Sequence, residues 1–289
     1  MSAPDEQVFA LPQLTIAARC WGDPSLPPLL ALHGWLDNAG SFDRLAPLLA
    51  DRHRVIAIDL PGHGRSAHRP AGAWYHYVDF LDEILAVLDR LGRPRVDLLS
   101  HSLGGTLACM LAGAFPERID RLALIEALGP LTGPDEDTAT RLRAGLEARR
   151  DRRGDRRRVF ETVEAAIAAR LTAGGLSEHG ARPIVERGLR RVEDGFVWAS
   201  DARLRLSSPM RFSEAQVLAV LAGIDAPTLL VLTEPDTPYL PREGIERRAA
   251  RVADIEIVRL GGGHHLHLER PEPVAATLSA FFARTPTRG

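Results

Sequence analysis

The segment that most constrains the fold lies at residues 96–108, where a short apolar run passes directly into a helical pattern. It reads Val-Asp-Leu-Leu-Ser-His-Ser-Leu-Gly-Gly-Thr-Leu-Ala. The first part predicts a buried strand, and the alanine-rich continuation predicts a helix. Ser102 would stand at the apex of the turn between them, beside the first amides of the helix, which have no partner within it. Both features suit a nucleophile.

This segment resembles the nucleophile elbow of the α/β-hydrolases, Gly-x-Ser-x-Gly, with Ser102 as the serine and Gly104 as the second glycine. Ser100 stands in place of the first glycine, so a crowded turn has to accommodate one more Cβ and a hydroxyl. An ordinary strand-to-helix loop, whose glycines only let the backbone turn, is the alternative for this segment alone. The rest of the chain has to decide between the two interpretations.

The order of apolar and helical patterns predicts an α/β fold. Short apolar runs occur at residues 28–32, 54–58, 122–125, 227–232 and 255–260, two short strands are expected within residues 7–21, and residues 74–91 show helical spacing. Alternation of strand and helix implies a mostly parallel, doubly wound sheet. Ligands of such sheets lie at the carboxyl ends of the strands, where we expect Ser102, His33 and Glu126.

The composition changes between residues 131 and 211, where strand-like runs vanish and Arg, Glu and Ala dominate. We interpret residues 131–211 as a helical cap, inserted into a core that residues 1–130 and 212–289 form. The arginine-rich run at residues 149–158 carries interleaved carboxylates. We interpret this run as a solvated helix face rather than as a site for an acidic partner.

The overall composition excludes several classes of function. A formal charge of −2 gives no general attraction to nucleic acid or to anionic membranes. No run approaches the roughly 18 apolar residues of a membrane span, and the start shows no targeting pattern, so a cytoplasmic protein is expected. All 36 basic residues are arginine, which excludes Schiff-base chemistry and a phosphate-loop lysine. The two cysteines, Cys20 and Cys109, cannot form a disulfide framework.

The candidate catalytic residues follow separate strands. The hydroxyl of Ser102 is protonated at neutral pH, so it needs a base within hydrogen-bond reach. The segment at residues 263–271 matches the pattern Gly-His-x-x-x-x-Glu-x-Pro of the resembling family, in which the first histidine, here His264, is catalytic. Asp236 follows an earlier strand and is our preferred acid to orient that imidazole, which completes the order Ser, acid, His. Glu126, after the strand that follows the elbow, is the alternative acid.

The loop after the strand at residues 28–32 begins with His33-Gly34, a dipeptide that α/β-hydrolases carry at this place. By that resemblance the backbone amides of Trp35 and Leu103 would form an oxyanion hole. We expect His33, Gly34 and His101 to contact the substrate. A turn plugged by an aromatic side chain is the alternative for this loop.

Three histidines, His264, His265 and His267, stand close together near the end of the chain. Such a group can suggest a metal site, but the chain shows no well-spaced set of further ligands. We therefore expect neither a metal nor a cofactor.

Four segments together resemble the serine hydrolase-like branch of the α/β-hydrolases: the elbow, residues 33–43, residues 125–130 and residues 201–204. Serine at the apex argues against dehalogenases and epoxide hydrolases, which use aspartate there. The resemblance implies a hydrolase that cleaves a small ester, thioester or lactone through an acyl-enzyme. A carbon–carbon bond hydrolase with the same triad and a nearly inactive ligand-binding relative are the alternatives. The sequence does not predict the oligomeric state.

Overall fold

The computed structural model describes residues 3–151, 158–237 and 241–284. An eight-stranded sheet runs through its centre in the order β1-β2-β4-β3-β5-β6-β9-β10. The strands are β1 (Asp5–Ala10), β2 (Thr15–Trp21), β3 (Pro28–Leu32), β4 (Arg54–Ile58), β5 (Val96–His101), β6 (Ile119–Ile125), β9 (Thr228–Glu234) and β10 (Ile255–Gly261). β2 pairs with β1 and β4 in antiparallel fashion, and the other neighbours are parallel. The predicted α/β class with a mostly parallel sheet is confirmed.

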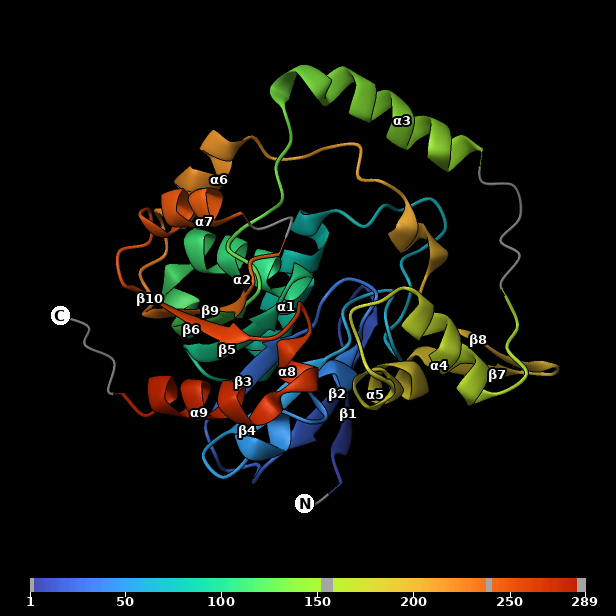
Figure 1. The fold of residues 1–289 in the computed structure, drawn as a ribbon, viewed down its shortest axis with the longest axis horizontal. Coiled ribbons are helices and arrows are strands. Elements are labelled where there is room, and N and C mark those ends of the chain that lie inside the picture. The colour runs from blue at the N-terminus through green and yellow to red at the C-terminus, as the bar shows by residue number, and fades with distance from the viewer. Residues whose placement is uncertain (1–2, 152–157, 238–240, 285–289) are drawn as a thin grey trace.

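Helices cover both faces of this sheet (Figure 1). One face packs against α1 (Tyr77–Arg90), α2 (Leu103–Ala114), α6 (Glu214–Leu221) and α7 (Arg242–Ala249), and the other against α8 (Leu266–Glu269) and α9 (Pro271–Phe282). Along β3, Leu30 and Leu32 point to the first core, while Leu29 and Ala31 point to the second, as alternation along a strand requires. Burial on both faces explains why the strands are continuous apolar runs.

The connections contain short 3₁₀ helices: η1 (Ala39–Phe42), η2 (Ala46–Leu48), η3 (Pro116–Arg118), η4 (Asp135–Asp137) and η5 (Ala202–Arg205). Within the described residues, none of the helices is both long enough and apolar enough to cross a membrane. Location in the cytoplasm stays a prediction from the sequence.

Between β6 and α6 the chain leaves the sheet. It forms α3 (Thr138–Arg150), α4 (Val163–Thr172) and α5 (Glu178–Gly188), and then an antiparallel hairpin of β7 (Leu189–Val192) and β8 (Gly195–Trp198). The hairpin corrects the expectation that this segment has no strands. Gly195, at φ 134°, turns the chain, and Phe196 and Trp198 of β8 pack against the small apolar cluster around Phe160. Residues 152–157 of the arginine-rich run lie outside the described residues.

Helix α5 is tied firmly to the core. The Arg187 side chain is fully buried, with Nε 3.0 Å from both carboxylate oxygens of Asp59 and Nη1 2.8 Å from Glu6 Oε1. The Asn38 side-chain amide donates to the carbonyl of Ile184 at 2.8 Å. Helix α5 is therefore fixed against β1 and the loops after β3 and β4.

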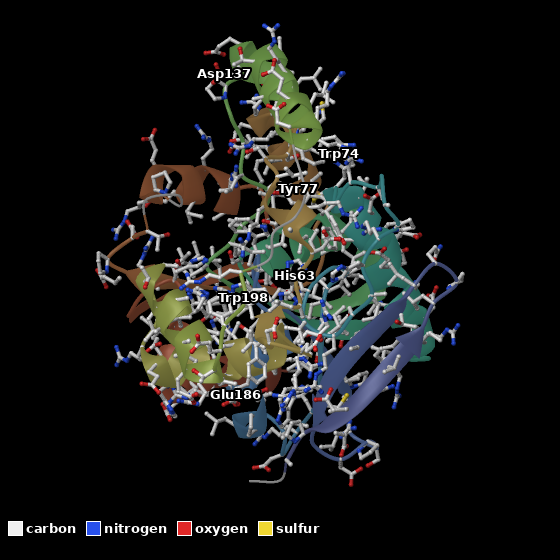
Figure 2. The ribbon with its side chains drawn as sticks, turned by 90° about the vertical axis from the view of Figure 1, so that its right-hand side faces the viewer. His63, Trp74, Tyr77, Asp137, Glu186 and Trp198 are labelled. Atoms are coloured by element: carbon white, nitrogen blue, oxygen red, sulfur yellow. The ribbon has the colours of Figure 1, made fainter. Side chains whose placement is uncertain are left out.

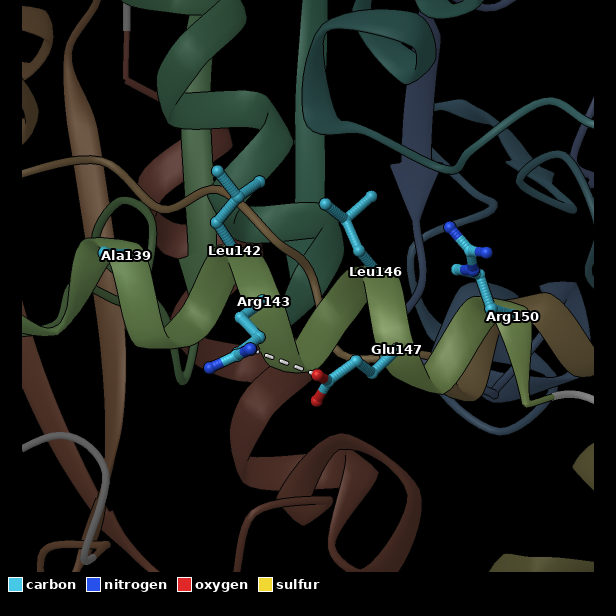
Figure 3. A pocket seen from close by; sticks show the side chains of 6 residues that line it. All are labelled: Ala139, Leu142, Arg143, Leu146, Glu147 and Arg150. Carbon is cyan, nitrogen blue, oxygen red and sulfur yellow. Dashed lines mark ion pairs between the residues drawn. The ribbon is translucent and has the colours of Figure 1, made fainter.

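Helix α3 contrasts with α5, because Gly145 is its only buried residue. Figure 1 shows α3 lying apart from the sheet, and Figure 2 marks its beginning with Asp137 at the far end of the molecule from Glu186 of α5. A depression of about 540 Å³ along one face of α3 is lined by Ala139, Leu142, Arg143, Leu146, Glu147 and Arg150 (Figure 3). Since one helix alone lines it, the depression is open surface and contains none of the candidate catalytic residues.

Candidate active site

The turn that carries Ser102 has the predicted strand, turn and helix. Ser102 lies between β5 and α2 with φ 51° and ψ −111°, a backbone conformation that L residues rarely adopt. Its amide donates to the carbonyl of Ile125 at 3.0 Å, which ties the turn to β6. A Cβ on Gly104 would lie 2.2 Å from the carbonyl oxygen of Leu32, so only glycine permits this approach of α2 to β3.

His264 stands between β10 and α8 and faces this serine. Its Nε2 lies 3.0 Å from Ser102 Oγ, and its Nδ1 lies 3.3 Å from Glu126 Oε2. The imidazole therefore bridges a hydroxyl and a carboxylate. This is the arrangement in which a histidine can take the proton of a serine.

Glu126 follows β6 directly, and both of its carboxylate oxygens have partners. Oε1 accepts a hydrogen bond from the Thr233 amide at 2.7 Å, while Oε2 faces His264. Its own amide donates to the carbonyl of Val231 at 2.9 Å, and its side chain is 1% exposed. These contacts with β9 fix the carboxylate at the carboxyl end of the sheet.

The structure corrects the preference for Asp236 as the acid. Asp236 forms ion pairs with Arg242, at 3.4 Å, and with Arg259. Its side chain is 29% exposed, and it lies two residues beyond the end of β9. Asp236 therefore faces two arginine side chains, and Glu126 occupies the place at His264 Nδ1.

The amides of Trp35 and Leu103, which are expected to form the oxyanion hole, belong to two segments that one hydrogen bond joins. Gly104 donates to the carbonyl of His33 at 3.0 Å, which joins the loop that contains Trp35 to the start of α2. Within the described part of the chain, neither the Trp35 amide nor the Leu103 amide donates to a protein acceptor. The indole of Trp35 donates to the carbonyl of Leu204 at 2.9 Å, although the residue is 54% exposed.

His33 and His101, two of the residues expected to contact the substrate, are both fully buried. His33 Nδ1 donates to the carbonyl of Gly34, and Nε2 accepts from the Leu60 amide at 3.0 Å. Burial lowers the pKa of His33 to about 4, so its ring is neutral near pH 7. His101 Nε2 donates to the carbonyl of His264 at 2.9 Å. Gly34 lies directly against the ring of His101.

Two further contacts near the site were not predicted from the sequence. His265 Nε2 lies 3.2 Å from Asp37 Oδ2, and His267 Nε2 lies 2.8 Å from Ser41 Oγ. Asp37 and Ser41 are buried residues in the loop after β3. Both residues lie within residues 33–43, which resemble the serine hydrolase-like branch, but that resemblance predicts no role for either of them.

Comparison with known proteins extends the likeness over nearly the whole chain. The model of the alpha/beta hydrolase fold family matches residues 27–271. A serine hydrolase-like protein from Danio rerio is 32% identical over 96% of this chain and 88% of its own. A crystal structure of a hypothetical protein from Pseudomonas aeruginosa PAO1 has a TM-score of 0.91 and 41% identity, covering 97% of this chain and all of its own. A thioesterase domain from the curacin biosynthetic pathway has a TM-score of 0.84 and 28% identity, covering 96% of this chain and all of its own.

Proposed function

The chain belongs to the alpha/beta hydrolase fold family, in its serine hydrolase-like branch, and from that premise we propose that it hydrolyses a small ester-type substrate with a Ser102–His264–Glu126 triad. One observation carries this proposal. His264 lies 3.0 Å from Ser102 Oγ on one side and 3.3 Å from Glu126 on the other. A neutral imidazole held in this way can accept the serine proton and share its new charge with the carboxylate.

In the first half of the proposed reaction, Ser102 Oγ bonds to the carbonyl carbon of the substrate while its proton passes to His264 Nε2. The carbonyl oxygen becomes an oxyanion and accepts hydrogen bonds from the amides of Trp35 and Leu103. The tetrahedral intermediate then collapses and the bond to the alcohol or thiol breaks. His264 returns the proton to this leaving group, and the acyl group stays on Ser102.

In the second half, a water molecule gives a proton to His264 and attacks the acyl carbon. Collapse of the second intermediate releases the carboxylic acid and returns the proton to Ser102. Glu126 takes no proton in either half. Its carboxylate, held by the Thr233 amide, orients His264 and stabilises the charged imidazolium.

The substrate class is proposed from the chemistry and the relatives together. Esters, thioesters and lactones all present an acyl carbon with a leaving group that His264 can protonate. The similarity to a thioesterase domain supports the inclusion of thioesters. We propose that residues 131–211 act as the cap that selects the acyl group, since α5 is fixed to the core through Arg187 and Asp59.

The test measures kcat/KM for p-nitrophenyl acetate and butyrate, an acyl-N-acetylcysteamine thioester and a γ-lactone. We expect hydrolysis of at least one of them, with a loss of at least about 10³-fold in Ser102→Ala. Ser100→Ala removes a hydroxyl two residues away and is the matched control, which should keep its activity. A folded protein that cleaves none of the four but releases products from a β-diketone would favour the carbon–carbon bond hydrolase. Binding of the esters without turnover would favour the ligand-binding relative.

A further inference from the structure

We propose that Asp37, His101 and His265 form a binding site for one Zn²⁺ ion behind the triad. Their ligand atoms, one carboxylate oxygen and two imidazole nitrogens, all lie within 4.8 Å of one another. Zn²⁺ prefers these atom types in proteins. The inference does not rest on the proposed function, because its test needs no substrate.

The hydrogen bond of His101 to the backbone determines which ring nitrogen can bind a metal. His101 Nε2 lies 2.9 Å from the carbonyl oxygen of His264. A carbonyl oxygen only accepts, so Nε2 carries the hydrogen. The ring is fully buried and Nδ1 has no hydrogen-bond partner within the described residues, so a second proton there would find no acceptor. Nδ1 is left with a bare lone pair, as in metal-bound histidines that donate their other N–H to a backbone carbonyl.

The lone pair of His101 faces a negative charge. His101 Nδ1 is buried, has no hydrogen-bond partner within the described residues, and lies 3.8 Å from Asp37 Oδ2. The carboxylate of Asp37 lies 3.2 Å from His265 Nε2 through Oδ2 and 3.9 Å from Arg170 Nη2 through Oδ1. The carboxylate is therefore ionised and no proton separates the two atoms. A cation between them would replace this repulsion by two bonds.

Gly34 keeps the space beside these atoms free of a side chain. A Cβ on Gly34 would lie 2.9 Å from His101 Nδ1 and 3.1 Å from Asp37 Oδ2, where it would crowd both ligand atoms. Around a tetrahedral zinc ion with bonds of about 2.0–2.1 Å, ligand atoms lie about 3.3 Å apart. The observed separations from Asp37 Oδ2, 3.2 Å to His265 Nε2 and 3.8 Å to His101 Nδ1, lie on either side of that value.

A simpler arrangement explains part of this cluster. Asp37 and His265 can form an ordinary ion pair without a metal, and Arg170 Nη2 lies 3.9 Å from the other oxygen of Asp37. Neither contact gives His101 Nδ1 a partner. A bound ion would satisfy that nitrogen. It would also link His101 to His265 and so hold His264, whose carbonyl accepts from His101.

The test titrates the chelator-treated full chain with Zn²⁺ by calorimetry and with Co²⁺ by visible absorption. We expect one ion per chain with micromolar or tighter affinity, and cobalt bands typical of a tetrahedral site. Asp37→Asn and His265→Gln remove a ligand, whereas Gly34→Ala keeps all three ligands and fills the space beside them. Each should weaken binding at least about tenfold. The matched control is His179→Gln, which changes an exposed histidine of α5 and should bind like the native chain.

Circular dichroism and thermal denaturation first establish that each variant is folded. If Asp37→Asn does not fold, the zinc affinities of Gly34→Ala and His265→Gln test the proposal. A native chain that binds no Zn²⁺ at micromolar concentration overturns the proposal. Folded variants that bind as tightly as the native chain, or a control that loses as much affinity as they do, also overturn it.

Discussion

His264 Nδ1 lies 3.3 Å from Oε2 of Glu126, a carboxylate that the Thr233 amide holds by its other oxygen at 2.7 Å. The acid of the proposed triad thus follows β6 rather than β9. Because the carboxylate is fixed at both oxygens, it favours the imidazole tautomer that keeps the lone pair of Nε2 toward Ser102.

Glu126→Gln should remove this orientation with little change in shape. We expect kcat to fall by about 10³-fold to 10⁴-fold, because an amide favours the wrong tautomer of His264 and cannot stabilise its charged form. Asp236→Asn changes a residue paired with Arg242 and Arg259 and should cost less than about tenfold. Steady-state hydrolysis of the best substrate measures both. A larger loss in Asp236→Asn than in Glu126→Gln would restore Asp236 as the acid.

The positive φ of Ser102 predicts a difference between two inactive variants. Glycine adopts φ 51° and ψ −111° without the strain that a Cβ brings, whereas alanine keeps that strain. Ser102→Gly should therefore be more stable than Ser102→Ala by about 1 kcal/mol, reduced somewhat by the greater freedom of glycine in the unfolded chain. Urea denaturation of the two variants measures this difference, and a more stable alanine variant would show that the turn is not strained.

The strand, turn and helix around Ser102 could be predicted because their signals are local in the sequence. The choice between Glu126 and Asp236 could not, since each follows a strand and β6 and β9 are neighbours in the sheet. Asp236 instead pairs with Arg259 on β10 and with Arg242 on α7, and chain order does not predict such contacts.

Two other features could not be predicted from the sequence, for different reasons. The hairpin of β7 and β8 has four-residue strands, and Arg190 and Arg191 occupy the middle of the first, so no apolar alternation marks it. The contact between Asp37 and His265 joins residues 228 positions apart, and no local pattern predicts such a pairing.

Ser100, which replaces the first glycine of the elbow, carries a buried Oγ without a hydrogen-bond partner within the described residues. Burying an unpaired hydroxyl costs about 1–3 kcal/mol, and alanine fits nearly the same space. Ser100→Ala should therefore raise the free energy of unfolding by about 1 kcal/mol, a rise of about 2 °C in Tm. Thermal denaturation measures this rise. A marked loss of stability would mean that the hydroxyl has a partner, such as an ordered water.

The lowered pKa of Asp201 predicts that the folded chain loses stability in acid. Burial alone would raise the pKa of this residue, but hydrogen bonds from Arg203 and Tyr75 outweigh it and lower the pKa from 3.8 to about 2. The folded pKa lies below the unfolded one, so the stabilisation is present above about pH 4 and is lost as the pH falls toward 2. Asp201→Asn should be less stable than the native chain at pH 7, and the difference should shrink across that window. Urea denaturation at several pH values measures it, and a constant difference would contradict it.

Substitution of the fully buried Arg187 should cause a large loss of stability. Arg187→Met would leave the buried carboxylate of Asp59 without its cation, which costs about 3–5 kcal/mol in comparable pairs. Adding Asp59→Asn should recover part of that loss, because the unpaired charge is then gone. Denaturation of the single and double variants measures this coupling, and equal stability of the two would show that the pair does not hold α5.

The activation of Ser102 by His264 is tested most directly by labelling with a fluorophosphonate, which reacts with an activated serine. We predict that the native chain is labelled and that folded Ser102→Ala and His264→Ala are not. Absence of labelling in the folded native chain, or labelling that persists in Ser102→Ala, would contradict the proposed triad.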